Sequence, residues 1–92
     1  MPSYLRPIVP GGTFFFTVNL RVRESRLLVD HVGELRAAYR TVRKEMPFET
    51  VAICILPNHL HAVWTLPEDD ADFSTRWKRI KTAFSKRIPK RV

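Results

Sequence analysis

The sequence predicts one α+β domain in which an antiparallel sheet is covered on one face by two helices. Three observations support this prediction. An aromatic and β-branched run lies near the N-terminus, two segments carry apolar residues at steps of three and four, and two further apolar runs lie between those segments. The predicted order of elements is therefore β-α-β-β-α. With 92 residues and a 45% hydrophobic fraction, the chain is large enough for one domain with a core.

The first strand is predicted over Thr13–Leu20, whose sequence is TFFFTVNL. Before it, residues 1–12 contain prolines at positions 2, 7 and 10 and end in two glycines. Proline fixes φ and glycine favours turns, so we expect an extended lead-in there.

A helix is predicted from Leu28 to Met46, and we expect Ser25 or Asp30 to cap its start and Pro47 to end it. The apolar stripe that predicts it consists of Leu28, Val32, Leu35, Tyr39, Val42 and Met46. Because Tyr39 lies on this stripe, a place in the core is favoured over a role as a nucleophile.

The second strand is predicted over Phe48–Leu56, where the apolar run is almost continuous. Such a run is typical of a central strand that is buried on both faces, and we expect it to lie beside the first strand. Cys54, the one cysteine, is then expected to be buried. A single thiol, together with the lack of a signal-peptide pattern, predicts a cytoplasmic protein. No segment is long enough to be a membrane span.

The third strand is predicted over His59–Leu66 and follows a short Pro57-Asn58 turn, which favours a hairpin with the second strand. A second helix, which Pro89 ends, is indicated by the stripe Phe73, Trp77, Ile80, Phe84 and Ile88. Asp70, Asp72 or Ser74 can cap its start. This order of elements is the ferredoxin-like split βαβ arrangement with its fourth strand absent.

The net charge of +7 is concentrated at one end of the chain. Residues 1–75 hold 8 Lys/Arg and 9 Asp/Glu, whereas residues 76–92 hold 8 Lys/Arg and no acid. A run of one sign can be a solvated helix face, but it also suits a polyanion such as nucleic acid. The candidate phosphate-binding residues are Arg76, Arg79, Lys86 and Arg87.

Two histidines flank one leucine in the third predicted strand. Side chains alternate along a strand, so His59 and His61 point to one face while Leu60 points to the other. Two imidazoles so placed can share one metal ion, although two ligands make only half of a metal site. The nearby Asp69, Asp70 and Asp72 are better explained as loop and capping residues. From spacing alone, structural histidines and a metal site remain equally open.

Three segments, PGGTFFFTVNL (10–20), LPNHLHAVW (56–64) and DFSTRWKRIK (72–81), resemble in order the tyrosine transposases of the HUH superfamily, REP-associated branch. The resemblance covers nearly the whole chain. It implies that His59 and His61 bind Mg²⁺ or Mn²⁺ beside a scissile phosphate of single-stranded or hairpin DNA. It also implies DNA transposition by strand cleavage and rejoining, in which a tyrosine on a later helix attacks the phosphate.

That later helix is expected beyond Val92, so the 92 residues are expected to form a truncated, catalytically incomplete domain with no catalytic residue of its own. Two alternatives stay open: a noncatalytic nucleic-acid-binding module with the RNA-recognition order of elements, and a structural remnant. The absent fourth strand leaves a free sheet edge, so a homodimer is predicted.

Overall fold

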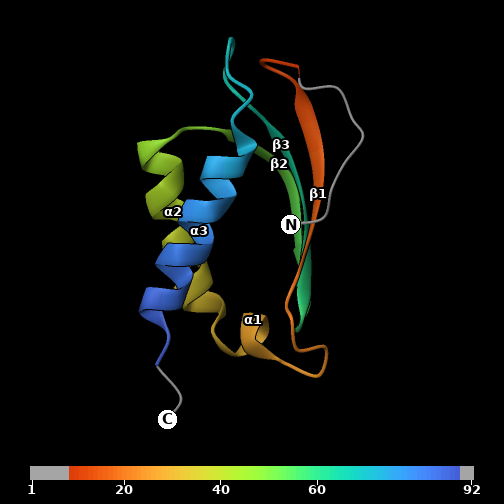
Figure 1. Cartoon of the computed structure of the whole chain (residues 1–92), viewed down its shortest axis with the longest axis vertical. Helices are drawn as coiled ribbons and strands as arrows, with labels where there is room; N and C mark the ends of the chain where they lie inside the picture. Colours follow the sequence, from red (N-terminus) through yellow and green to blue (C-terminus); the bar gives the residue numbers. More distant parts are fainter. Residues whose placement is uncertain (1–8, 90–92) are drawn as a thin grey trace.

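The computed structural model describes residues 9–89, and one sheet and one layer of helices make up this part of the chain (Figure 1). The strands are β1 (Thr13–Asn19), β2 (Glu49–Ile55) and β3 (His59–Thr65). The helices are α1 (Leu27–Asp30), α2 (Val32–Glu45) and α3 (Phe73–Arg87). The predicted α+β, split βαβ class is confirmed. Of the predicted lead-in, residues 1–8 lie outside the described range. No helix within residues 9–89 is long and apolar enough to cross a membrane.

The sheet order is β1-β3-β2, and β3 pairs antiparallel with both of its neighbours. The prediction that β2 is the central strand beside β1 was therefore wrong. β3 takes the central place because the connection through α2 places β2 one strand position away from β1. The β2–β3 hairpin then places β3 in the position between them. As an edge strand, β2 leaves Val51 56% and Ile53 40% exposed, and Cys54 is exposed rather than buried.

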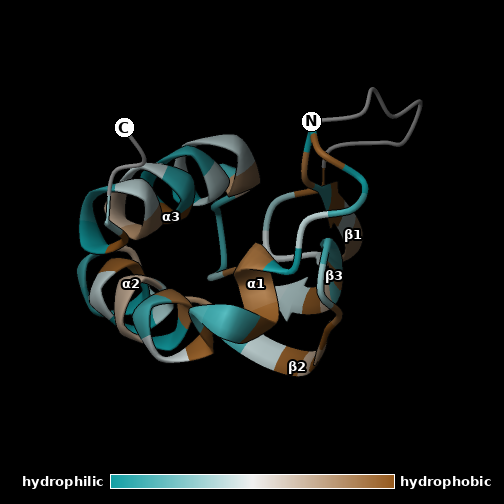
Figure 2. Ribbon diagram, turned by 90° about the horizontal axis from the view of Figure 1, so that it is seen from below, coloured by the Kyte–Doolittle hydropathy of each residue, from teal (hydrophilic) through white to brown (hydrophobic). Residues whose placement is uncertain are grey.

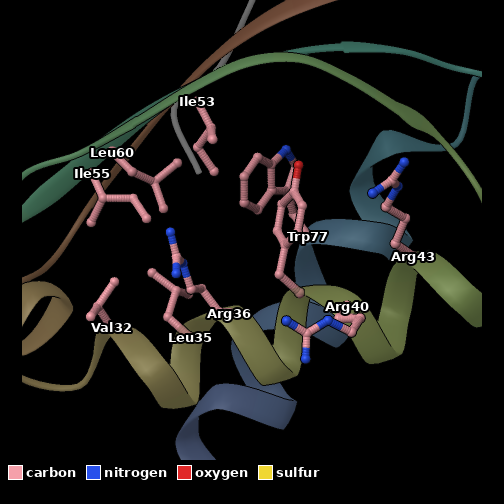
Figure 3. Close-up of a pocket in the computed structure, with 10 residues that line it drawn as sticks. Val32, Leu35, Arg36, Arg40, Arg43, Ile53, Ile55, Leu60 and Trp77 are labelled. Atoms are coloured by element: carbon pink, nitrogen blue, oxygen red, sulfur yellow. The ribbon is translucent and has the colours of Figure 1, made fainter.

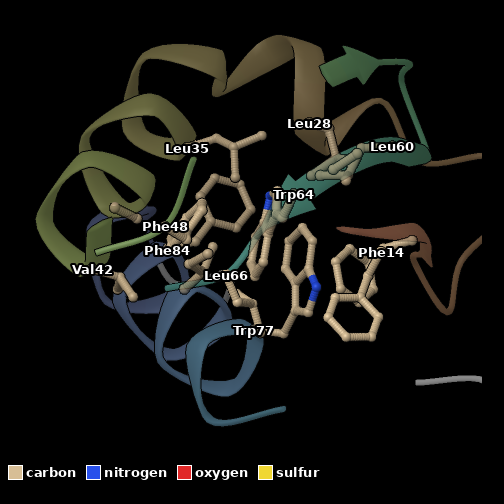
Figure 4. Packing of buried hydrophobic residues seen from close by; sticks show 14 residues of the cluster. Phe14, Leu28, Leu35, Val42, Phe48, Leu60, Trp64, Leu66, Trp77 and Phe84 are labelled. Carbon is tan, nitrogen blue, oxygen red and sulfur yellow. The ribbon is translucent and has the colours of Figure 1, made fainter. Parts of the chain in front are cut away.

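The core lies between the sheet and the helices (Figure 4). Burial alternates along the whole of β3 and the first half of β1, whereas β2 has no buried residue. On β3, Leu60, Ala62 and Trp64 are buried, while the residues between them are only partly covered. The Trp64 ring stacks on Trp77 of α3 with 4.3 Å between centroids. Figure 2 shows α2 and α3 side by side on one side of the sheet. The sheet thus has a helix-covered face and a second face, here called the open face.

The predicted first helix is two helices in the structure, since the chain breaks at His31, which has φ −120° and ψ 38°. The predicted caps agree in part with the structure. Asp72 caps α3 by accepting the Thr75 N–H at 3.0 Å. The N-cap of α1 is Arg26, without a side-chain cap hydrogen bond, so neither Ser25 nor Asp30 is the N-cap, although the Ser25 hydroxyl accepts the Leu27 N–H at 3.1 Å. Asp70 has another role, described below.

Candidate metal centre and nucleic-acid interface

His59 and His61 lie side by side on the open face of the central strand, as the alternation predicts. Their ring centroids are 5.0 Å apart and the ring planes are nearly perpendicular. Leu60, between them, is 4% exposed and packs into the core on the opposite face. The buried leucine holds the strand in register, so the two imidazoles sit on a rigid element rather than on a loop.

Each imidazole uses its Nδ1 atom in a hydrogen bond within the domain. His59 Nδ1 lies 2.7 Å from Asn58 Oδ1, and His61 Nδ1 lies 3.1 Å from Thr17 Oγ1. Such contacts fix the orientation of a ring and leave Nε2 as the nitrogen that can bind a cation. Asn58 is itself held by a 2.6 Å hydrogen bond from its Nδ2 to the Arg23 carbonyl.

The histidine pair offers two metal ligands. Among residues 9–89, no group of three or more His, Cys, Asp or Glu side chains is close enough to hold a metal ion. Cys54 is the cross-strand partner of His61, a placement that sequence reasoning missed because it assigned Cys54 to the core. Imidazole nitrogens fit a divalent cation only if water, phosphate oxygens or a further ligand complete the coordination shell.

Phe15 is a second feature of the open face. It is 52% exposed, whereas Phe14 and Phe16 are 4% and 0% exposed. Its ring stacks on the His61 imidazole with 5.8 Å between centroids and 17° between planes.

Arg76, predicted to bind DNA, is 2% exposed and serves the fold instead. Its guanidinium donates to the carbonyls of Met46 at 3.0 Å and Pro47 at 2.9 Å, and it bridges to Asp70 Oδ2 at 3.0 Å. These bonds tie the end of α2 and the start of β2 to α3. The hydrogen bonds from Arg76 hold the pKa of Asp70 below its usual value. We therefore correct the assignment of Arg76, because all its donors are engaged away from solvent.

The other three predicted cations are exposed on α3. Arg79 pairs loosely with Glu45 at 3.3 Å, Arg87 reaches the Thr41 hydroxyl at 3.4 Å, and Lys86 is solvent-exposed. All three belong to the helical layer, so the sheet separates them from the histidine pair on the open face (Figure 1).

Sequence reasoning passed over a second set of cations. Arg36, Arg40 and Arg43 of α2 follow one another at i, i+4 and i+7 and line a cavity of about 500 Å³ between α2 and the sheet (Figure 3). Its apolar lining includes Ile53 and Ile55 of the edge strand. The signal was present in the spacing, since these arginines fall beside the apolar stripe of the helix.

Tyr39 is the one tyrosine within residues 9–89. Its hydroxyl is hydrogen-bonded to Thr50, its ring packs edge-on against Phe48 and Trp64, and burial raises its pKa. It lies on the helix-covered face, so the sheet separates it from the histidine pair. The prediction that Tyr39 packs in the core agrees with this position.

The described residues thus form a three-stranded split βαβ sheet with two histidines on the open face of its central strand. In sequence and in fold the chain resembles the REP-associated tyrosine transposases over almost its whole length. It is 51% identical over 85 residues to the REP-associated tyrosine transposase of Escherichia coli, covering 92% of this chain and 52% of that protein. It is 43% identical over 90 residues to a putative REP-associated tyrosine transposase of Haemophilus influenzae, covering 98% of this chain and 51% of that protein.

A solved structure of a REP-associated tyrosine transposase bound to a REP hairpin superposes with a TM-score of 0.87 at 50% identity, covering 94% of this chain and 52% of that chain. No protein-family model matches the chain. The chain thus spans about half the length of the relatives it matches.

Proposed function

We propose that this chain is a DNA-binding unit of the REP-associated tyrosine transposase type, which binds single-stranded or hairpin DNA in DNA transposition. The observation that carries the proposal is the pair His59 and His61, held side by side on the central strand of a fold that matches a transposase solved with a REP hairpin. Both rings have Nδ1 engaged, which leaves two Nε2 atoms for one divalent cation.

Mg²⁺ or Mn²⁺ is the proposed cation. When bound beside a phosphodiester, it would polarise a phosphoryl oxygen and stabilise the charge that develops there. The imidazoles supply nitrogen ligands, and both cations also accept oxygen ligands from water and phosphate. We therefore expect weak metal binding by the protein alone and tighter binding when DNA is present.

Manganese binding tests the proposed centre directly. Mn²⁺ titrations followed by electron paramagnetic resonance should show an ion bound to the protein, with higher affinity in the presence of hairpin DNA. His59→Ala with His61→Ala should lose this signal, whereas His31→Ala, a histidine on the other side of the sheet, should keep it. Equal Mn²⁺ binding by the wild type, the double variant and His31→Ala would refute the proposed centre.

Cleavage should need a tyrosine that residues 9–89 do not place at the histidine pair, because Tyr39 lies on the opposite face of the sheet. We therefore propose that this chain alone binds hairpin DNA in Mn²⁺ without forming a covalent adduct. A protein–DNA adduct that survives denaturing electrophoresis would contradict this, and Tyr4→Phe would then show whether Tyr4 is the attacking residue.

A noncatalytic nucleic-acid-binding module is the second candidate, favoured by the lack of a third metal ligand in residues 9–89. Hairpin affinity that is unchanged by removal of both histidines, with and without Mn²⁺, would favour this candidate. The predicted homodimer and cytoplasmic location remain proposals. The outer edges of β1 and β2 have no partner strand in the described part of the chain, and a dimer mass by light scattering would support pairing there.

A further inference from the structure

We propose that Phe15 forms a nucleobase platform, which stacks one base of single-stranded DNA next to the phosphate at the histidine pair. This inference rests on the proposed function and adds a base-binding site to it. The ligand class is an unpaired nucleotide, recognised through the π-face of its base.

Phe15 differs from its neighbours on β1 in its exposure. Three consecutive phenylalanines on β1 divide into two that are buried in the core and one that is 52% exposed on the open face. A single exposed apolar residue is ordinary. Phe15 differs because its ring lies almost parallel to the imidazole of a candidate metal ligand, at 5.8 Å and 17°.

The surroundings of the Phe15 ring are short and uncharged on β1 and β3. Phe15 is the cross-strand partner of Val63, and the flanking positions on this face carry Thr13, Thr17 and Thr65. Short side chains leave the ring accessible. The threonine hydroxyls are already hydrogen-bonded within the sheet, Thr13 to Thr65 at 2.8 Å and Thr17 to His61 Nδ1 at 3.1 Å, so only part of their capacity is left for the edge of a base. β1 and β3 contain no acidic residue, so no carboxylate on these strands repels a phosphate.

The Phe15 ring is continuous with the histidine pair. Phe15 stacks on His61, and His61 in turn contacts His59 with 5.0 Å between ring centroids. In this proposal, a nucleotide whose base stacks on Phe15 has its sugar and phosphate next to the histidine pair. The platform would position the DNA strand, and the cation held by the histidines would bind the phosphate.

Phe15→Ala tests the platform in the full chain, with DNA affinity measured by fluorescence anisotropy in Mn²⁺. The DNA is a hairpin with a single-stranded extension, and a parallel series replaces each unpaired nucleotide in turn by an abasic one. Loss of one stacked base weakens binding by about five- to a hundredfold. The loss of DNA affinity caused by Phe15→Ala should lie in that range. Phe15→Trp should retain affinity, and Phe15→Leu should lose it.

The abasic series decides whether a specific base is stacked. At one position the wild type and Phe15→Ala should bind with equal affinity, because the base that the ring contacts is already missing. Val51→Ala, which trims an exposed apolar side chain on β2, should bind every DNA as the wild type does. A uniform loss at all positions, or no loss, would overturn the platform.

Two further measurements distinguish the base platform from a purely structural role of Phe15 and from the proposed function. If Phe15→Ala weakens Mn²⁺ binding without DNA and no abasic position matters, the ring only orients His61 and the platform is refuted. If hairpin binding or the metal centre fails, but an unstructured oligonucleotide still binds with a dependence on Phe15, the proposed function falls and the platform stands.

Discussion

Arg76 is a buried cation in a basic segment whose other described cations are exposed. What distinguishes it is a set of acceptors that come from elsewhere in the chain: the carbonyls of Met46, Pro47 and Asp72 and the carboxylate of Asp70. A buried guanidinium is stable only when such acceptors satisfy it.

Arg76→Ala is expected to destabilise the domain by roughly 3 kcal/mol, since it leaves carbonyl groups and a carboxylate without their partner. Arg76→Lys should recover only part of this loss, because an ammonium group cannot reproduce the planar fork. Urea denaturation followed by tryptophan fluorescence measures both. Lys78→Ala, an exposed change on the same helix, should leave the midpoint in place, and an Arg76→Ala protein as stable as this control would contradict the role.

Asp70 should make the stability of the domain pH-dependent. Its pKa is lowered in the folded state by the hydrogen bonds from Arg76, so the folded protein binds fewer protons there than the unfolded chain. The stabilisation is complete above the unfolded pKa of about 3.9 and is lost as the pH falls through the lower folded pKa. Asp70→Asn should thus lower the melting temperature at pH 7, and its difference from the wild type should shrink in thermal melts below about pH 4. A constant difference would argue against the linkage.

At the scale of an element, β3 carries two functions on its two faces. Its even-numbered residues fill the core and its odd-numbered residues form the open face with the histidine pair. A shift by one residue would exchange the two sets, so the burial of Trp64 and the placement of His61 depend on the same register.

Trp64→Ala and Val63→Ala test this register with neighbouring positions. Trp64 is 0% exposed, so its removal should cost about 3–5 kcal/mol in unfolding free energy. Val63 lies on the open face, and Val63→Ala should cost less than about 1 kcal/mol. Equal losses in chemical denaturation would mean that the alternation of β3 is not as described.

At the scale of the whole molecule, the sheet separates two candidate DNA contacts. The histidine pair and Phe15 lie on the open face, while the exposed cations of α3 lie on the helical layer. A DNA ligand that uses both must therefore pass around an edge of the sheet. In the proposed function, the exposed cations of α3 would contact phosphates and position the DNA, and the open face would hold the strand near the proposed metal centre.

The triple change Arg79→Ala, Lys86→Ala and Arg87→Ala should weaken hairpin binding and flatten its salt dependence, because each lost phosphate contact removes about 0.9 from the slope of log K against log salt. A matched control changes Arg21, Arg23 and Arg26, three exposed cations of the β1–α1 loop, to alanine. Titrations at several salt concentrations compare the two. Equal slopes for both triples would show that only net charge matters.

The sequence by itself determined the type and order of the three strands and of the two long helical segments, and the common face of His59 and His61. These follow from periods of two and 3.6 residues, which are local properties of the backbone. It did not determine that β3 lies between β1 and β2, that Cys54 is exposed, or that Arg76 is buried. Tertiary structure decided these, because each depends on which distant segment supplies a neighbouring strand or a hydrogen-bond acceptor.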